Sequence, residues 1–251
     1  MSDLAPDRMR PRLRGFFGEP YLYVAETSST QDVLRDSEHP HGAVAVAEHQ
    51  TAGRGRSGRR WEDEPETALL FSVVLEPPSG SPLPQLSLVA GVAVAVALER
   101  EGAVPTLVKW PNDVLVERAK VAGILLEAAG GRVVCGIGVN VDQDEDELPH
   151  ETRAPATSLR LAAGRRFDRG VLLAAVLDEL ERTYAAWLGH GLEALADELE
   201  RRNALDGAIV SVDGRRGVAG AIAADGRLTV ELDGGETVLV ESGEVEIQAT
   251  D

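Results

Sequence analysis

A glycine-rich segment, Gly53-Arg54-Gly55-Arg56-Ser57-Gly58, most constrains what this chain can fold into. It follows residues 43–48, a continuous run of small apolar residues that is typical of a buried strand. The segment matches the dinucleotide-binding fingerprint, but that fingerprint requires a helix to begin at its end. Residues 61–65 intervene here, and residues 69–75 then have the pattern of another strand. The sequence therefore argues against a Rossmann fold.

The same segment concentrates positive charge. Arg54, Arg56, Arg59 and Arg60 lie close together in a chain with 25 Lys and Arg against 42 Asp and Glu, a formal net charge of −17. A P-loop is excluded, because Lys and Ser/Thr would have to follow Gly58. Guanidinium groups match carboxylate and phosphate oxygens, so the segment indicates an anionic ligand; a solvated basic loop is the alternative. We expect the loop to be mobile until a ligand orders it.

A second cluster, Lys109-Trp110-Pro111-Asn112-Asp113, is followed seven residues later by Lys120. One interpretation has Pro111-Asn112-Asp113 as turn residues, Trp110 as a core residue and both lysines as solvated surface groups. In the other, Lys120 begins an apolar strand and its ammonium points into a cleft beside the Asp113 carboxylate. Together with the arginine loop, that arrangement would suit an anionic, activated substrate.

Composition narrows the class of protein. The chain has 251 residues, 43% of them hydrophobic, which is enough for at least one full core. No apolar run is long enough to span a membrane, and the basic residues 1–14 lack a following apolar segment, so we expect no membrane span and no secretory signal. The single Cys135 cannot form an internal disulfide, which favours the cytoplasm. The negative net charge makes nucleic acid a poor default partner.

The patterning predicts α/β (α+β) architecture, with a mixed sheet flanked by helices. Expected strands are residues 21–25, 43–48, 69–75, 106–109, 121–128 and 133–141, the last two joined by a hairpin turn at Gly130-Gly131. Expected helices are residues 31–35, residues 86–98 and a segment that Asp168 caps and Gly189 ends.

After Asn203 the pattern changes to short strands of even spacing, a pattern typical of a small antiparallel barrel. The expected strands are residues 208–212, 217–223, 228–232, 237–240 and 245–247, with turns at 213–214, 225–226, 234–235 and 242–243. We therefore predict two domains, residues 1–202 and 203–251.

At the two clusters the sequence resembles the biotin protein ligases. The motifs that carry the resemblance are residues 48–61 (EHQTAGRGRSGRRW), 109–113 (KWPND), 120–125 (KVAGIL) and 136–141 (GIGVNV), in the family's order. The similarity extends from about Tyr23 to Val245, nearly the whole chain.

The resemblance implies a catalytic domain related to class II aminoacyl-tRNA synthetases, followed by a small SH3-like β-barrel. It implies a two-step reaction that uses ATP, biotin and Mg²⁺. Biotin is first activated to biotinyl-5′-AMP, and the biotinyl group then passes to a lysine of a biotin carboxyl carrier protein, part of a biotin-dependent carboxylase.

The resemblance also assigns site residues. Those implied to bind biotin are Ser29, Thr30, Gln31, Gln50, Arg54, Gly55, Arg56 and Lys120. Those implied to contact ATP or the adenylate are Arg54, Arg56, Lys109, Asn112 and Asn140. Arg54 and Arg56 would close over the acyl-phosphate, Lys120 would neutralise charge during adenylation, and Asp113 would orient or deprotonate the carrier lysine. Asp113 is also the possible magnesium ligand.

The sequence departs from the family at two positions and leaves alternatives open. Gln31 stands where the family more often has Asn, and Gln248 where many relatives have Arg. Many bacterial relatives begin with a DNA-binding winged helix, whereas the first expected strand here starts near Tyr21, so we expect no DNA binding. The alternatives are a lipoate protein ligase, which should lack the arginine loop, a biotin-sensing repressor, and a protein that binds biotin without transferring it.

Overall fold

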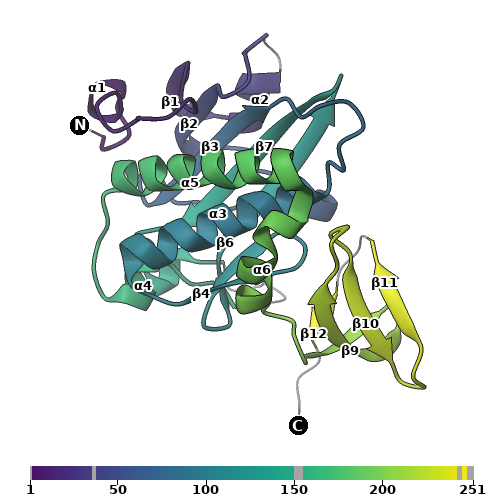
Figure 1. Cartoon of the computed structure of the whole chain (residues 1–251). Coiled ribbons are helices and arrows are strands. Elements are labelled where there is room, and N and C mark those ends of the chain that lie inside the picture. Colours follow the sequence, from purple (N-terminus) through teal and green to yellow (C-terminus); the bar gives the residue numbers. More distant parts are fainter. Residues whose placement is uncertain (1, 36–37, 150–154, 242–244, 248–251) are drawn as a thin grey trace.

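A computed structural model of the chain describes residues 2–35, 38–149, 155–241 and 245–247. A large sheet is covered by helices, and a smaller sheet lies at the C-terminal end (Figure 1). The helices are α1 (Pro6–Met9), α2 (Thr30–Arg35), α3 (Gln85–Gly102), α4 (Leu159–Ala163), α5 (Arg169–His190) and α6 (Ala196–Arg202), with short 3₁₀ turns η1 (Arg56–Gly58), η2 (Glu145–Glu147) and η3 (Gly191–Leu195).

The large sheet is mixed, as predicted. Its strands are β1 (Tyr21–Thr27), β2 (Val44–Gln50), β3 (Ala68–Leu75), β4 (Thr106–Lys109), β5 (Asp113–Val116), β6 (Ala119–Ala129) and β7 (Arg132–Asn140), in the order β1-β2-β3-β7-β6-β5-β4. Only the β1–β2 pair is parallel among these neighbours. Gly130 and Gly131 form the predicted β6–β7 turn with φ of 60° and 84°, values that favour glycine.

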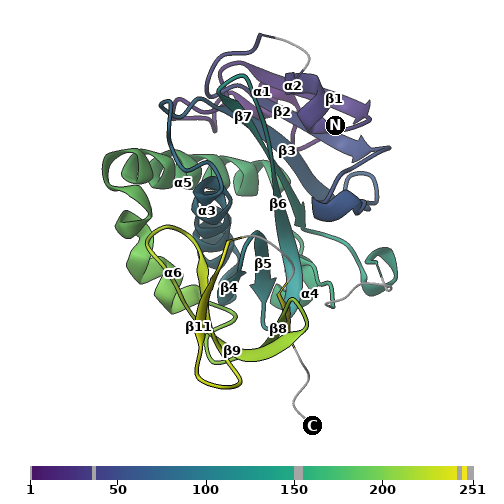
Figure 2. The same cartoon turned by 90° about the vertical axis from the view of Figure 1, so that its right-hand side faces the viewer.

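The two faces of this sheet differ. α3 and α5 cover one face (Figures 1 and 2), where residues such as Val73, Ile124 and Val139 form the main core. α2 packs on the opposite face through Leu34, against Ala45. Because side chains alternate along a strand, residues next to those of the main core point towards α2. The candidate site lies on this α2 face.

The two long helices form where the sequence predicted them. α3 is apolar almost throughout, which its buried position between α5 and the sheet explains. Asp168 caps α5, as predicted, by accepting a hydrogen bond from the N–H of Val171 at 3.1 Å. The predicted end at Gly189 was wrong: α5 continues to His190, and Gly191, with φ of 66°, is the C-cap.

The small sheet is antiparallel throughout. Its strands are β8 (Ile209–Val212), β9 (Arg215–Ile222), β10 (Leu228–Leu232), β11 (Thr237–Val240) and β12 (Glu246–Ile247), in the order β11-β10-β9-β8-β12. The predicted turn at 242–243 lies outside the described residues. Leu205, Val210 and Leu228 belong to the same core as the large sheet, so the two sheets are packed together. The division at residues 202 and 203 stays a prediction.

The sequence analysis missed several short elements. β5 begins at Asp113, which one interpretation treated as a turn residue; Lys109 pairs with Asp113, so three residues connect β4 to β5. The other α-helices that were missed, α1, α4 and α6, have four, five and seven residues, too few to show a clear helical period. Within the described part of the chain, no helix has the length and apolar character needed to span a membrane.

Candidate active site

Glycines on the α2 face of β6 and β7 form a flat floor. Gly123 pairs directly with Gly138, and Gly136 follows on the same face two residues away. A Cβ on Gly136 would lie 2.8 Å from the side chain of Gln31, and one on Gly138 would lie 2.6 Å from the Trp61 ring. These glycines therefore let two large side chains lie directly against the backbone of the sheet.

Buried polar side chains lie beside this floor, where α2 begins and β2 ends. Thr30 donates its backbone N–H to Gln50 Oε1 at 2.7 Å, and its hydroxyl lies 2.7 Å from Ser72 Oγ. Ser29 Oγ accepts from the backbone N–H of Gln31 at 3.3 Å. Four of the residues that the resemblance assigns to biotin (Ser29, Thr30, Gln31 and Gln50) are at most 8% exposed. The structure thus brings them into one cluster.

Gln31 lies across the floor. Its Nε2 donates to the carbonyls of Leu125 at 3.2 Å and Val134 at 3.4 Å, on neighbouring strands β6 and β7. The amide therefore bridges two strands above Gly136. The extra methylene that distinguishes Gln from the family's more frequent Asn gives the side chain this additional reach.

The arginine loop folds back on itself as a narrow ladder. The N–H of Gly55 donates to the carbonyl of Arg59 at 2.8 Å, and that of Trp61 to Gly53 at 3.0 Å. A Cβ on Gly53 would lie only 2.7 Å from the Trp61 carbonyl, so this close approach requires glycine. At the tip, Gly58 has φ of 73°, which also favours glycine. Glycine is therefore required at residue 53 and favoured at residue 58.

Arg54 is held by acidic side chains. Its Nε lies 2.8 Å from Glu127 Oε1, and its Nη1 lies 2.9 Å from Asp32 Oδ1. Burial by itself would lower the pKa of Arg54, but hydrogen bonds and attraction from Glu127 and Asp32 outweigh it and raise that pKa. The sequence did not predict these contacts with carboxylates on α2 and β6, and the mobility of the loop without a ligand stays a prediction.

Arg56 lies in a different cluster, which surrounds Asp113. Lys120 Nζ lies 2.6 Å from Asp113 Oδ1, the pair that the second interpretation predicted, and Trp110 is a core residue, as the first one predicted. Arg56 Nη1 donates to Asn112 Oδ1 at 3.4 Å. Burial lowers the pKa of Lys109, as does repulsion from Lys120, while Asp113 opposes the shift. Three cations thus gather around one carboxylate, which leaves an excess of positive charge.

Asn140 has a structural position beside this cluster. It is 5% exposed, donates from Nδ2 to the carbonyl of Thr157 at 3.0 Å and accepts from Gln143. Thr157 follows Ala156, which forms a β-bridge with Lys120 of β6. Its side-chain groups therefore have protein partners, and it fixes the chain next to Lys120.

Comparisons with known proteins agree with this arrangement. The model of the biotin/lipoate A/B protein ligase family matches residues 23–144. The biotin--[acetyl-CoA-carboxylase] ligase of Mycobacterium tuberculosis is 38% identical over 237 residues, which cover 88% of this chain and 86% of that protein. A structure of the Aquifex aeolicus biotin protein ligase with biotin and ATP superimposes with a TM-score of 0.83 at 31% identity, covering 91% of this chain and 98% of that one.

The chain belongs to the biotin protein ligase family. The bifunctional ligase/repressor BirA of Bacillus subtilis is also similar, with 37% identity over 185 residues. This match covers 69% of the chain and 56% of that protein, so the chain spans about half the length of this relative. The mixed sheet with a separate antiparallel C-terminal sheet is the fold that the resemblance implied.

Trp61 and His49 lie in the motif at residues 48–61, and the sequence predicted no role for either. Trp61 lies on the glycine floor, and its indole N–H is buried without a hydrogen-bond partner among the described residues. His49 contacts the buried Asp63 through Nδ1 and Oδ2, 2.9 Å apart, and burial raises the pKa of Asp63. The sequence gave no signal for this contact, because Asp63 lies in a segment without regular structure.

The described residues contain no group of three or more His, Cys, Asp or Glu side chains that could hold a metal ion. Asp113 is the carboxylate at the cation cluster, and Mg²⁺ in nucleotide sites takes most of its ligands from phosphates and water. A magnesium ion that arrives with ATP would therefore need few protein ligands.

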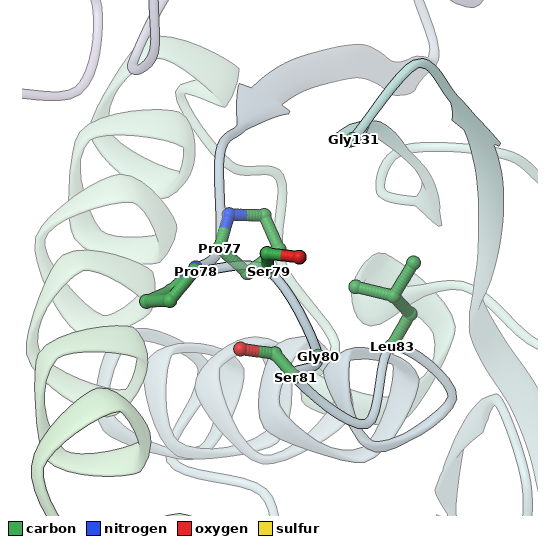
Figure 3. Close-up of a pocket in the computed structure, with 7 residues that line it drawn as sticks. All are labelled: Pro77, Pro78, Ser79, Gly80, Ser81, Leu83 and Gly131. Carbon is green, nitrogen blue, oxygen red and sulfur yellow. The ribbon is translucent and has the colours of Figure 1, made fainter.

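A hollow elsewhere on the surface does not compete with this site. It lies between the segment that precedes α3 and the β6–β7 turn (Figure 3). Its lining consists of Pro77, Pro78, Ser79, Gly80, Ser81, Leu83 and Gly131. No charged or titratable side chain lines it, so it offers no group for acid–base or anion chemistry.

Proposed function

We propose that this chain is a biotin protein ligase that makes biotinyl-5′-AMP from biotin and ATP and then biotinylates a carrier protein. The observation that carries the proposal is the cation cluster, Arg56, Lys109 and Lys120 around Asp113, next to a buried polar cluster of neutral side chains. A ligand with a neutral, hydrogen-bonding head and a reactive carboxylate fits these two neighbouring clusters.

Biotin would place its bicyclic ring with the neutral side chains. Ser29, Thr30 and Gln50 offer hydroxyl and amide groups that are nearly inaccessible to water, which suits a ureido group with both donors and acceptors. Gln31 lies on the glycine floor beside these side chains, and Gly55 would contact biotin through its backbone, as the resemblance implies. We propose that Trp61, whose indole N–H has no partner among the described residues, packs against the edge of the ligand.

Adenylation would use the excess positive charge. A biotin carboxylate oxygen attacks the α-phosphorus of ATP, the new bond is an acyl phosphate, and pyrophosphate leaves. Lys120 and Arg56 would stabilise the charge that develops on the α-phosphate oxygens, with Lys109 and Asn112 orienting the nucleotide. Mg²⁺, when bound with ATP, would neutralise phosphate charge, and a contact with Asp113 is the alternative to the role of this carboxylate in transfer.

Transfer would depend on Asp113. The carrier lysine must lose a proton before its nitrogen can attack the acyl carbon, after which an amide forms and AMP leaves. The Asp113 carboxylate, already 2.6 Å from one ammonium group, has the position to orient a second and to accept its proton. We infer a cytoplasmic reaction whose acceptor is the biotin carboxyl carrier domain of an acyl-CoA carboxylase.

The test is a reconstituted reaction. The protein is incubated with ATP, Mg²⁺, biotin and a purified carrier domain, and the carrier is weighed by mass spectrometry. We expect the addition of one biotinyl group, lost when ATP is omitted or when the carrier lysine is replaced by Arg. In a parallel reaction with lipoate in place of biotin, a lipoyl group on the carrier and none with biotin would identify a lipoate ligase instead. Release of biotinyl-AMP without modification of the carrier would show that the protein carries out the first step only.

A further inference from the structure

The C-terminal sheet supplies none of the side chains assigned to the site, yet it contacts the turn that carries Asp113. Trp110 donates its indole N–H to the carbonyl of Gly226 at 3.0 Å. Gly226 belongs to the turn between β9 and β10, 116 residues away in the sequence. Trp110 is 3% exposed, and a buried indole N–H without an acceptor would be costly. The contact therefore fixes the position of residues 110–112, which connect β4 to β5 and are called the catalytic turn below.

The turn that provides this carbonyl has its own internal bonds. The N–H of Ala223 donates to Arg227 and that of Gly226 to Ala223, both at 2.8 Å. Asp225 accepts from the backbone N–H of Arg227 at 3.0 Å. The acceptor for Trp110 is thus presented by a well-defined turn.

A second contact anchors the same turn to α3. Gln85, which is 6% exposed, donates from Nε2 to the carbonyl of Ala224 at 3.3 Å and accepts from the indole N–H of Trp187 at 2.7 Å. A Cβ on Gly226 would lie 3.1 Å from Gln85 Cγ, so the turn is seated closely on this side chain. α5, α3 and the β9–β10 turn are connected through Gln85.

The catalytic turn is held on its other side by α3 and β6. Ser87 donates its hydroxyl to the carbonyl of Pro111 at 2.9 Å. Asn112 donates from Nδ2 to the carbonyl of Ile124 at 3.0 Å and accepts from the N–H of Ile124 at 2.9 Å. With these bonds in place, Trp110 is the link through which the C-terminal sheet acts on the turn.

We propose that Trp110 and Gln85 are positioning residues, through which the β9–β10 turn fixes the orientation of Asp113 for transfer of the biotinyl group. The activity part of this proposal rests on the proposed function. Neither residue needs to touch a substrate. The role of the C-terminal sheet would then be exerted through backbone carbonyls at residues 224 and 226, independently of the residue at position 248.

The test compares three variants of the full-length protein. W110F keeps an aromatic ring but removes the donor to Gly226. Q85E keeps an oxygen for Trp187 but removes the donor to Ala224. N203A is the matched control, because Asn203 Nδ2 donates to the carbonyl of Gly220 at 2.9 Å across the same junction, a side-chain contact that does not involve residues 110–112.

We expect W110F to lower the single-turnover rate of biotinyl transfer about three- to tenfold, as the loss of one buried hydrogen bond would, and leave KM for biotin unchanged. Q85E should act in the same direction. N203A should lower the melting temperature comparably but leave both rates as in the wild type. Equal rate losses in W110F and N203A, or unchanged transfer in W110F and Q85E, would overturn the proposal.

Hydrogen exchange provides a readout that does not depend on activity. The N–H of Asn112 donates to the carbonyl of Lys109 at 3.2 Å within the catalytic turn. Its exchange should accelerate in W110F and Q85E but not in N203A. If the wild type proves inactive with biotin, the proposed function fails, and this exchange pattern still decides whether the C-terminal turn positions the catalytic one.

Discussion

Arg54 and Arg56 are separated by one glycine, but their side chains enter opposite electrostatic surroundings. Arg54 lies between Asp32 and Glu127, at distances of 2.9 and 2.8 Å. Arg56 lies with two lysines around Asp113, and burial together with repulsion from Arg59 lowers its pKa despite attraction from Asp113. One arginine has its charge balanced within the protein, whereas the other contributes to an excess. We infer from this difference that Arg54 fastens the loop, and we propose that Arg56 binds the anion.

Replacement of Lys120 should give the largest effect in the cation cluster. Lys120→Ala removes a charge near the proposed α-phosphate site, so we expect the single-turnover rate of biotinyl-AMP formation to fall roughly 10²- to 10⁴-fold. Circular dichroism should show an intact fold. Normal adenylation in this variant would mean that the charge excess around Asp113 has no part in the first step.

Replacement of Asp113 should divide the two steps. Asp113→Asn keeps the shape but loses the charge and the proton acceptor, so transfer from supplied biotinyl-AMP should fall roughly 10²- to 10³-fold, more than adenylation does. The two half-reactions are measured separately by single turnover. If adenylation is blocked and transfer is spared, the carboxylate acts as the magnesium ligand instead.

Replacement of Arg56 should weaken retention of the intermediate. Arg56→Ala removes one guanidinium from the cluster, so biotinyl-AMP should leave about ten times faster in a chase experiment. Hydrogen exchange in the wild type should show protection of residues 54–60 when biotin and ATP are added. The matched replacement Arg60→Ala removes a side chain that contacts the carbonyl of Thr51 at 2.7 Å, and its release rate should change less.

The sequence predicted much of this comparison but not its decisive part. One of the two interpretations of the lysine motif put Lys120 beside Asp113, and apolar patterning located β6, which carries Lys120, but not β5, which Asp113 begins. Arg54 and Arg56 differ in their electrostatic surroundings because Asp32 and Glu127 pair with Arg54. These two carboxylates approach the loop only after α2 and β6 have packed. Trp61 lies on glycines of two other strands for the same reason. Local patterns do not encode such contacts, because they join residues distant in the chain.

The fastening role of Arg54 can be tested by a double-mutant cycle. If Glu127 is its structural partner, Arg54→Gln and Glu127→Gln should each raise KM for biotin only about two- to fivefold, and the double variant should be no worse than either single one. A ligand contact by Arg54 predicts another pattern, in which Arg54→Gln slows adenylation strongly and Glu127→Gln does not.

Replacement of Lys109 should give the smallest effect, a change in the stability of the fold. Burial lowers its pKa, so the folded state disfavours the ammonium form, and at neutral pH the charge destabilises the fold. Lys109→Met should therefore raise the melting temperature at pH 7 while it weakens ATP binding. As the pH rises through the lowered pKa, the folded wild type releases this proton and recovers stability, so the advantage of the variant should shrink. A destabilised Lys109→Met, or an advantage that grows with pH, would show that Lys109 is already balanced within the protein. Lys109 would then resemble Arg54, whose charge is balanced by carboxylates, and would not contribute to the excess of positive charge around Asp113.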